Sequence, residues 1–395
     1  MLEHLNANMF VFIIFVIFTG AALLSTLALF TRQSLLVAYI LLGIILGPWI
    51  NFISGDAQLI ENIGHVGIVF LLFLLGLDLN PRDLLSMLKK ASWITFGSSF
   101  IFGVISYLIA RFFGFNFTES LITSLAMMFS STIIGLKLLP TTVLHHQHTG
   151  ELIVSVLLLQ DLLVIVVLLF IRAFEGDGLT LKDFLVLLVA LPTLLIIGFT
   201  MERFIIYPLL KRFDRIREYI FLLAVGWCLW MAQIAVFLGL SAEIGAFIAG
   251  VSIAVGPIAR YIAENLKPLR DFFLVLFFFS VGAGLQYSEL NLVIIPALVL
   301  AGVLLIVKPL VFRMLFRLSG ESDEVSAEAG VRLGQASEFS LILASLAGVM
   351  MPTLMSTKAN TLIQLATVFT FIVSSYWVVL RYPTPLAFSE KLRRE

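Results

Sequence analysis

The sequence predicts an all-α polytopic membrane protein, and three observations support this. Hydrophobic residues make up 60% of the 395 positions and charged residues 13%, with a mean hydropathy of +1.08. A soluble chain has about 25% charged residues. Apolar runs alternate with short polar loops, and several runs approach the ~20 residues that a helix needs to cross a bilayer. Lys and Arg are concentrated in alternate loops, as in proteins with a fixed membrane topology.

The apolar runs predict about thirteen spans. Each is bounded by charged residues or by loops that contain proline or glycine. The ninth is short and the twelfth carries several polar residues. The spans are placed at 9–30, 34–50, 62–79, 91–112, 118–138, 152–171, 184–206, 219–238, 241–256, 271–287, 291–316, 325–350 and 357–380.

The distribution of Lys and Arg predicts the orientation. Loops after odd-numbered spans hold most of these residues, including the run KRFDRIR at 211–217, and this side is expected to be cytoplasmic. The N-terminus is then outside and the C-terminus inside the plasma (inner) membrane. We expect one transmembrane domain over 1–395, embedded from about 9 to 380, with a short cytoplasmic tail at 381–395. The opposite loops hold only Arg111, Arg172, Lys182 and Lys358.

Other function classes are disfavoured. The formal net charge is +0, so nothing favours nucleic acid as a partner. A single cysteine, Cys228, excludes an intrachain disulfide framework and a cysteine metal cluster. The sequence has no HExxH, no GxSxG and no pair of catalytic acids within one span, so we expect no enzyme activity and no cofactor.

Asp161 is the strongest functional candidate. It lies near the middle of the span 152–171, directly after Gln160. A charge at that depth costs ~3 kcal/mol on insertion scales. A carboxylate kept there indicates an ion site, a proton relay or a counter-ion.

Two spans are predicted to be interrupted. The fifth contains Ser130, Ser131 and Thr132 near mid-depth, and the twelfth contains GQASE at 334–338, which ends with Glu338. Broken helices free backbone groups to line a cavity, and one break in each half of a chain is typical of inverted-repeat transporters. The alternative is close helix packing, which also uses small polar residues.

Two further charges in the spans have open roles. Lys308 precedes a proline in the eleventh span; it is the obvious partner for Asp161, or it snorkels to the cytoplasmic face. Glu338 is a site or gating residue, or it pairs with Arg332.

Three acidic or basic groups lie nearer the span ends. Glu243 follows Ser241, and ordinary helix N-terminal chemistry is the favoured interpretation, with a gating role as the alternative. Asp78 is either a turn signal or part of an ion entrance. His145, His146 and His148 form a loop cluster able to bind metal or sense pH; a solvated loop is favoured.

Six segments in order resemble the monovalent cation:proton antiporter-2 family, in its Kef-type branch. No segment is specific alone, but together they cover nearly the whole chain. They are FLLGLDLNP at 73–81, SSTIIGLKLL at 130–139, LLLQDLLVI at 157–165, GLSAEIGAFIAGVSIA at 239–254, Lys308, and GQASEFSLIL at 334–343.

The resemblance implies two inverted six-helix repeats, a core domain with two crossed broken helices, and a dimerisation domain that makes a homodimer. It implies that Asp161 binds the cation and the proton in turn, and that Gln160 and positions 130–132 belong to its site. Kef systems often carry a nucleotide-binding regulatory domain after the last span. Only a short basic tail follows here, so we expect regulation, if any, through a separate subunit.

The expected function is exchange of K⁺ or Na⁺ for H⁺ by competition at Asp161, with alternating access and no net charge moved. Three alternatives stay open: an organic-anion/Na⁺ carrier, a gated cation channel, and an ion sensor that does not transport. The sequence does not separate Na⁺ from K⁺, because the same oxygen ligands hold both.

Overall fold

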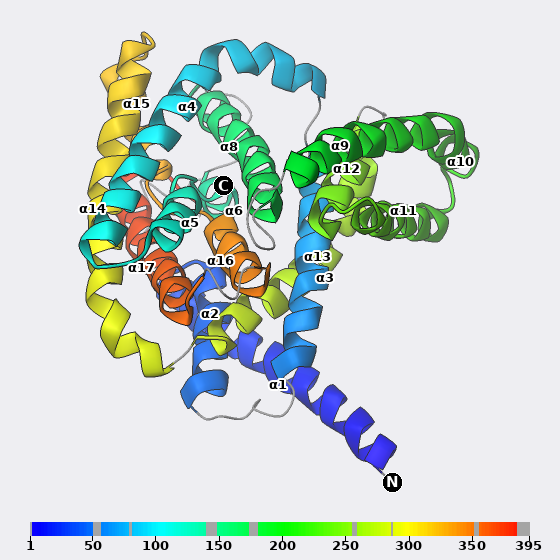
Figure 1. The fold of residues 1–395 in the computed structure, drawn as a ribbon, viewed down its shortest axis with the longest axis horizontal. Helices are drawn as coiled ribbons and strands as arrows, with labels where there is room; N and C mark the ends of the chain where they lie inside the picture. The colour runs from blue at the N-terminus through cyan, green and yellow to red at the C-terminus, as the bar shows by residue number, and fades with distance from the viewer. Residues whose placement is uncertain are drawn as a thin grey trace. The chain divides into compact units, whose positions relative to one another are not determined.

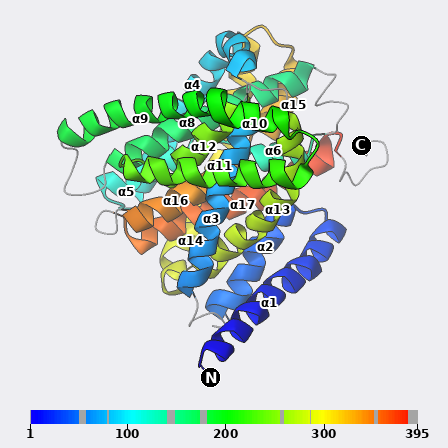
Figure 2. The ribbon, with the colours of Figure 1, turned by 90° about the vertical axis from the view of Figure 1, so that its right-hand side faces the viewer.

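The computed structural model describes residues 2–49, 57–78, 81–139, 148–173, 181–254, 259–285, 287–350 and 355–384. Within these ranges the chain is built from helices (Figures 1 and 2). Each of the thirteen predicted ranges overlaps one or more of the described helices, and the all-α prediction is confirmed.

The helices of the first half end with the one that carries Asp161. They are α1 (Leu2–Phe30), α2 (Leu35–Ile44) continued by the π-helical turn η1 (Ile45–Trp49), α3 (Ala57–Asp78), α4 (Pro81–Phe112), α5 (Phe117–Met127), α6 (Thr132–Lys137) and α8 (His148–Ala173).

The helices of the second half begin with one that bends through a π-helical turn. They are α9 (Leu181–Met201), η2 (Glu202–Ile206), α10 (Tyr207–Arg212), α11 (Arg217–Phe237), α12 (Ala242–Ala254), α13 (Ala259–Ala283), α14 (Tyr287–Leu318), α15 (Asp323–Arg332), α16 (Glu338–Met350) and α17 (Thr357–Arg381).

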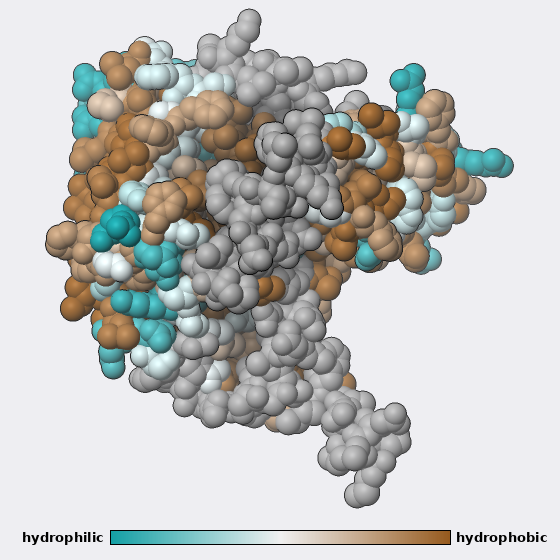
Figure 3. Space-filling view, viewed as in Figure 1, coloured by the Kyte–Doolittle hydropathy of each residue, from teal (hydrophilic) through white to brown (hydrophobic). Residues whose placement is uncertain are grey.

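Apolar surface and helix length fit a membrane environment. Among the described residues, eight helical stretches are long and apolar enough to cross a bilayer, and four more are apolar but shorter. Large apolar side chains face outward, as Trp93, Phe96 and Phe100 do on α4 with 63%, 58% and 71% exposure. Figure 3 shows such apolar residues spread over the described surface. The exact number of crossings stays a prediction.

The chain divides into two compact units. The first contains residues 1–61, 90–160 and 275–395, and the second contains residues 62–89 and 161–274. In the first unit α14 packs on α15 and α17, and α16 packs on α5 and α17. In the second unit α12 packs on α11 and α9.

Glycines allow close helix contacts within each unit. In the second unit, a Cβ on Gly250 of α12 would lie 2.1 Å from the carbonyl oxygen of Phe73 in α3. In the first unit, a Cβ on Gly43 of α2 would lie 2.1 Å from the carbonyl oxygen of Phe279 in α13. At both places the backbones touch, so no side chain larger than hydrogen fits without moving a helix.

The two glycine contacts are counterparts in an internal repeat. Gly76 of α3 faces Gly250, and Gly282 of α13 faces Gly43. Gly76 and Gly282 lie 206 positions apart in the sequence. Gly43 and Gly250 are 207 positions apart. The contact of α2 with α13 therefore corresponds to that of α12 with α3. This agrees with the predicted duplicated architecture, in which α2 is equivalent to α12 and α3 to α13.

Gly250→Ala is expected to lower the melting temperature of the detergent-solubilised protein by several degrees. The added methyl would press on a backbone oxygen, and overpacking of this kind costs about 1–3 kcal/mol. Gly226→Ala is the matched control, because Gly226 lies inside α11 and a Cβ there meets nothing within 4 Å. Equal melting temperatures for the two variants would contradict this account of the contact.

Candidate cation and proton site

Two helices of the first unit are interrupted where the sequence predicts. α5 ends at Met127 and the next helix begins at Thr132, while α15 ends at Arg332 and α16 begins at Glu338. The residues between them, 128–131 and 333–337, are not helical. Backbone groups freed at membrane depth must find other partners or line a cavity, so the contacts of these gaps identify the site.

The two interruptions bind each other. The Ser130 hydroxyl donates to the Leu333 carbonyl at 2.7 Å. The Gln335 amide donates from Nε2 to the Ser131 carbonyl at 3.3 Å. Ser340 of α16 donates to the carbonyl of Ala126 in α5 at 2.6 Å. The breaks therefore meet, as predicted.

Lys308 of α14 lies between the two breaks. Its side chain is 0% exposed, and Nζ donates to the carbonyls of Phe129 and Gln335. These two carbonyls follow the C-terminal ends of α5 and α15, where the helix dipoles carry partial negative charge. Phe129 and Gln335 also lie 206 positions apart, so one ammonium group binds the same carbonyl in both repeats.

This geometry overturns one expectation for Lys308. A snorkelling side chain would reach the aqueous interface, whereas this one is fully enclosed, with Nζ 5.1 Å from the ring centroid of Phe102. The freed carbonyls replace water as its partners. The predicted ion pair with Asp161 joins residues of different units and stays a prediction.

Glu338 lies at helix N-termini, whereas Lys308 lies at helix C-termini. It is the first residue of α16, is 1% exposed, and accepts from the Ile133 N–H at 3.1 Å through Oε1. Its carboxylate thus lies at the N-terminal turns of α6 and α16, where partial positive charge gathers. Oε2 is buried and has no hydrogen-bond partner among the described residues.

Arg332, the alternative partner considered for Glu338, pairs with another acid. Arg332 is 1% exposed, and its Nη2 lies 2.8 Å from a carboxylate oxygen of Glu328, one helical turn away. Nη1 donates to the carbonyl of Leu138 at 2.9 Å, and Nη2 also donates to the carbonyl of Pro383 at 2.8 Å. The acid four residues earlier, Glu328, pairs with the guanidinium. The Glu338 carboxylate instead contacts the first break.

The helix α8 brings Gln160 to the first interruption. Gln160 is 0% exposed, and its Oε1 accepts from the Ser130 N–H at 3.0 Å. Its Nε2 is buried and has no partner among the described residues. Asp161 is the next residue of α8 and is 1% exposed. Each of the two residues expected at the midplane is thus buried.

The hydroxyls of the first break have distinct tasks. Ser130 and Ser131 are both 0% exposed. The Ser131 hydroxyl accepts from the Ile134 N–H at 3.0 Å and so caps α6 as well as lining the gap. Thr132 begins α6.

Sequence reasoning missed the polar face of α17. Its Thr370 hydroxyl accepts from the Ala336 N–H at 3.0 Å, and its Ser374 hydroxyl donates to Oε1 of Gln335 at 3.0 Å. The signal was present: Thr367, Thr370 and Ser374 recur at helical spacing within an apolar span. These hydroxyls hold the second break at Gln335 and Ala336.

The remaining predicted residues lie outside this cluster or outside the described residues. Glu243 is in the first turn of α12, and the Ser241 hydroxyl accepts from the Ile244 N–H at 3.4 Å, which agrees with the helix-start interpretation. The gating role of Glu243 stays a prediction. Asp78 ends α3, and its side chain is outside the described part.

The histidine cluster is described only in part. His145 and His146 lie outside the described residues. His148 begins α8, and its Nε2 lies 2.9 Å from a carboxylate oxygen of Glu321. In the portion of the chain that the structure describes, no group of three or more His, Cys, Asp or Glu is arranged to hold a metal ion.

Comparison with known proteins gives one family and a consistent fold. Residues 11–380 match the family model described as "Sodium/hydrogen exchanger, transmembrane". The chain is 29% identical over 329 residues to K(+) efflux antiporter 4 of Arabidopsis thaliana, which covers 79% of this chain. It spans 54% of that relative's length, so about half of the relative has no counterpart here.

Two solved structures have the same architecture. Both are of the sodium proton antiporter MjNhaP1 from Methanocaldococcus jannaschii. The structure at pH 8 has a TM-score of 0.75 at 14% identity and covers 94% of this chain and 97% of that one. The electron-microscopy structure has a TM-score of 0.66 at 18% identity and covers 94% of each chain. At these identities the likeness establishes the fold.

Proposed function

Because the chain belongs to the sodium/hydrogen exchanger family, whose members are membrane transporters and not enzymes, we propose that it exchanges K⁺ or Na⁺ for protons. The family model extends over nearly all predicted spans. The Arabidopsis relative is named a K⁺ antiporter and the structural neighbours sodium proton antiporters. These names support a monovalent cation as the substrate and leave its identity to measurement.

The proposed step is competition at Asp161. When deprotonated, the carboxylate binds the cation together with oxygens from Gln160 and positions 130–132. When protonated, it is neutral and releases the cation. Oxygens from unwound backbone and neighbouring side chains are the usual ligands of alkali cations in broken-helix transporters. If one carboxylate exchanges one proton for one monovalent cation, each cycle moves no net charge.

The observation that carries this proposal is the bond from the Ser130 N–H to Gln160. It ties the midpoint of α8, where Asp161 follows, to the first helix interruption. Lys308 and Glu338 neutralise opposite helix ends at the same interruptions, so the freed backbone is stabilised without closing it into a continuous helix. Glu338, with an unpartnered oxygen, is proposed as a gating or charge-balancing residue.

The cellular setting follows the sequence expectations. We propose a multi-pass protein of the plasma (inner) membrane with the N-terminus outside and the C-terminus in the cytoplasm. A homodimer and a separate regulatory subunit belong to the same proposal. Residues 1–395 act as a single transmembrane domain in this scheme, which exposes the site alternately to the two sides.

The test is ion exchange in proteoliposomes that contain a pH-sensitive dye. After an acid-inside gradient is set, pulses of Na⁺, K⁺, Li⁺ and Rb⁺ should dissipate it for at least one of Na⁺ and K⁺, and protein-free vesicles should not respond. A potential-sensitive dye should report no change if exchange is one for one. Cation flux without obligatory proton movement would indicate a channel and contradict the proposal. A potential generated by exchange would contradict only the stoichiometry.

A further inference from the structure

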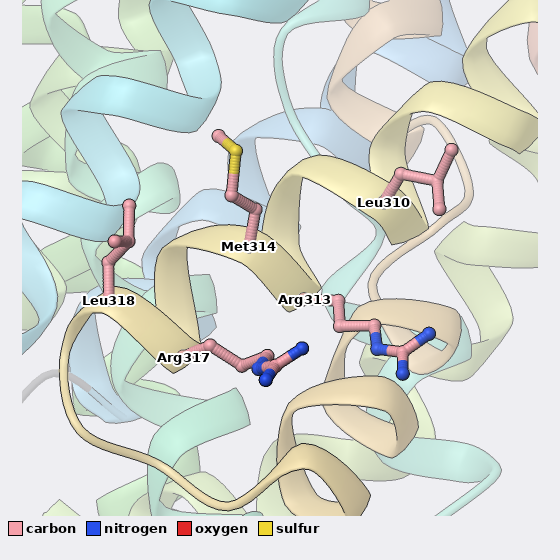
Figure 4. Close-up of a pocket in the computed structure, with 5 residues that line it drawn as sticks. All are labelled: Leu310, Arg313, Met314, Arg317 and Leu318. Atoms are coloured by element: carbon pink, nitrogen blue, oxygen red, sulfur yellow. The ribbon is translucent and has the colours of Figure 1, made fainter.

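The last turns of α14 carry an exposed face that mixes apolar and basic side chains. Leu310, Met314 and Leu318 are 57%, 49% and 70% exposed. Arg313 and Arg317 lie between them at helical spacing, with side chains 43% and 60% exposed. These five residues line a surface hollow of about 630 Å³ and all come from one helix (Figure 4).

The other face of the same turns is packed into the protein. Phe312, Leu315 and Phe316 are 0%, 3% and 0% exposed. Exposure of the first face is therefore a property of one side of the helix and not a sign of a frayed end. It is the side of this membrane helix that its own unit leaves uncovered.

The length of the helix places the arginines at a membrane surface. The apolar stretch Ser288–Leu318 has 31 residues, which at 1.5 Å per residue is ~46 Å long. The hydrocarbon core is ~30 Å thick. The final turns therefore reach the headgroup region, with the apolar neighbours of the arginines beside the acyl chains.

The two arginines share one carboxylate unequally. Asp323 binds Arg313 through two bonds, 3.0 Å to Nε and 2.6 Å to Nη2. Arg317 makes a single contact to the same carboxylate, 3.3 Å from Nη1. The hydrogen bond from Arg313 holds the pKa of Asp323 below its usual range. Two further acids lie nearby, Glu324 in the first turn of α15 and Glu321, which His148 contacts. Of the two arginines, Arg317 is therefore the one whose donors are less occupied.

We propose that this face binds the phosphate of an anionic phospholipid, with Arg317 as the main contact and Leu310, Met314 and Leu318 against its acyl chains. Basic side chains next to a membrane helix end attract anionic headgroups. The apolar flanks favour a lipid over a free anion, because they gain burial only from an acyl chain. The site is separate from the ion site and does not depend on the transport proposal.

The test is lipid retention by the full chain, purified in detergent and measured by native mass spectrometry. Wild-type protein should retain dioleoylphosphatidylglycerol over dioleoylphosphatidylcholine. Arg317→Gln should bind phosphatidylglycerol about fivefold less, since one basic residue near a membrane surface contributes ~1 kcal/mol. It leaves both Arg313–Asp323 bonds intact, so the fold should be retained. Arg217→Gln is the matched control, because Arg217 is an exposed arginine that begins α11.

A second variant acts in the opposite direction. Asp323→Asn removes the competing carboxylate and should increase phosphatidylglycerol retention. Unchanged retention in both Arg317→Gln and Asp323→Asn would overturn the proposal. So would equal retention of the two lipids by wild-type protein. If millimolar inorganic phosphate displaces phosphatidylglycerol, the site recognises a free anion and the lipid assignment is wrong.

Discussion

Asp161→Asn is expected to reduce cation-dependent proton exchange to the level of protein-free vesicles. Asparagine keeps the shape of the side chain but has no charge to gain or lose between pH 5 and 9. The site can then neither attract the cation by a full charge nor release it by taking up a proton. The measurement is the pH-dye assay in proteoliposomes with the cation that drives the wild-type protein.

The same substitution should not unfold the protein. Asp161 is 1% exposed, and asparagine has nearly the same volume and keeps one acceptor oxygen. Loss of a charge at membrane depth does not hinder insertion, so we expect normal membrane insertion and a folded protein with a cooperative melting transition. Inactivity with a normal melting temperature assigns Asp161 to the transport step.

Glu119→Gln is the matched control for loss of a buried acid. Glu119 is 7% exposed and accepts from the Asn116 N–H at 2.9 Å in the capping box that starts α5. Glutamine serves at this position of a capping box as well, so exchange should persist. Full exchange by Asp161→Asn would refute the mechanism. Loss of exchange in both variants would show that any change in buried charge disables the protein.

Much of the architecture could be predicted from the sequence because polar side chains are costly within the hydrocarbon core and are therefore rare there. Ser130–Thr132 and GQASE stand out only because hydroxyls, glycine and an acid are rare within apolar spans. Both predicted breaks are present. The close packing at Gly245 and Gly250 was also predictable, although its partners in α11 and α3 were not.

The partners of the buried charges could not be predicted in the same way. Sequence reasoning considered only charged side chains as partners, Asp161 for Lys308 and, as one alternative, Arg332 for Glu338. It could not find the backbone acceptors of Lys308, such as the carbonyl of Phe129, 179 positions away. Such acceptors exist only after two helices break and meet. The Arg332–Glu328 pair, by contrast, was readable from its i,i+4 spacing.

Lys308→Met is expected to lower the melting temperature of the purified protein more than any surface substitution. The carbonyls of Phe129 and Gln335 lose their shared donor. Each buried acceptor left unsatisfied costs about 1–3 kcal/mol. Methionine fills a similar volume, so a cavity does not contribute. Relief from burying the ammonium offsets part of the loss, and we expect a net loss of about 3 kcal/mol.

Lys358→Met is the control that distinguishes the loss of the two carbonyl hydrogen bonds from the loss of the cation–π contact. The Lys358 Nζ lies 5.0 Å from the Phe115 ring centroid, much as Lys308 lies 5.1 Å from that of Phe102. A cation–π contact at an exposed site contributes ~0.5–1 kcal/mol, so the control should shift the melting temperature little. The difference between the two variants then measures what the ammonium contributes at the two helix ends.

The combination of stability and transport decides between the two roles open to Lys308. If the ammonium mainly holds the helix ends, Lys308→Met should be unstable, and any protein that remains folded should still exchange ions, if more slowly. If it mainly serves as the counter-ion of Asp161, the variant should melt like the wild type and fail to exchange. The second outcome would contradict the structural role, because two orphaned carbonyls in the same cluster cannot leave the folded state unaffected.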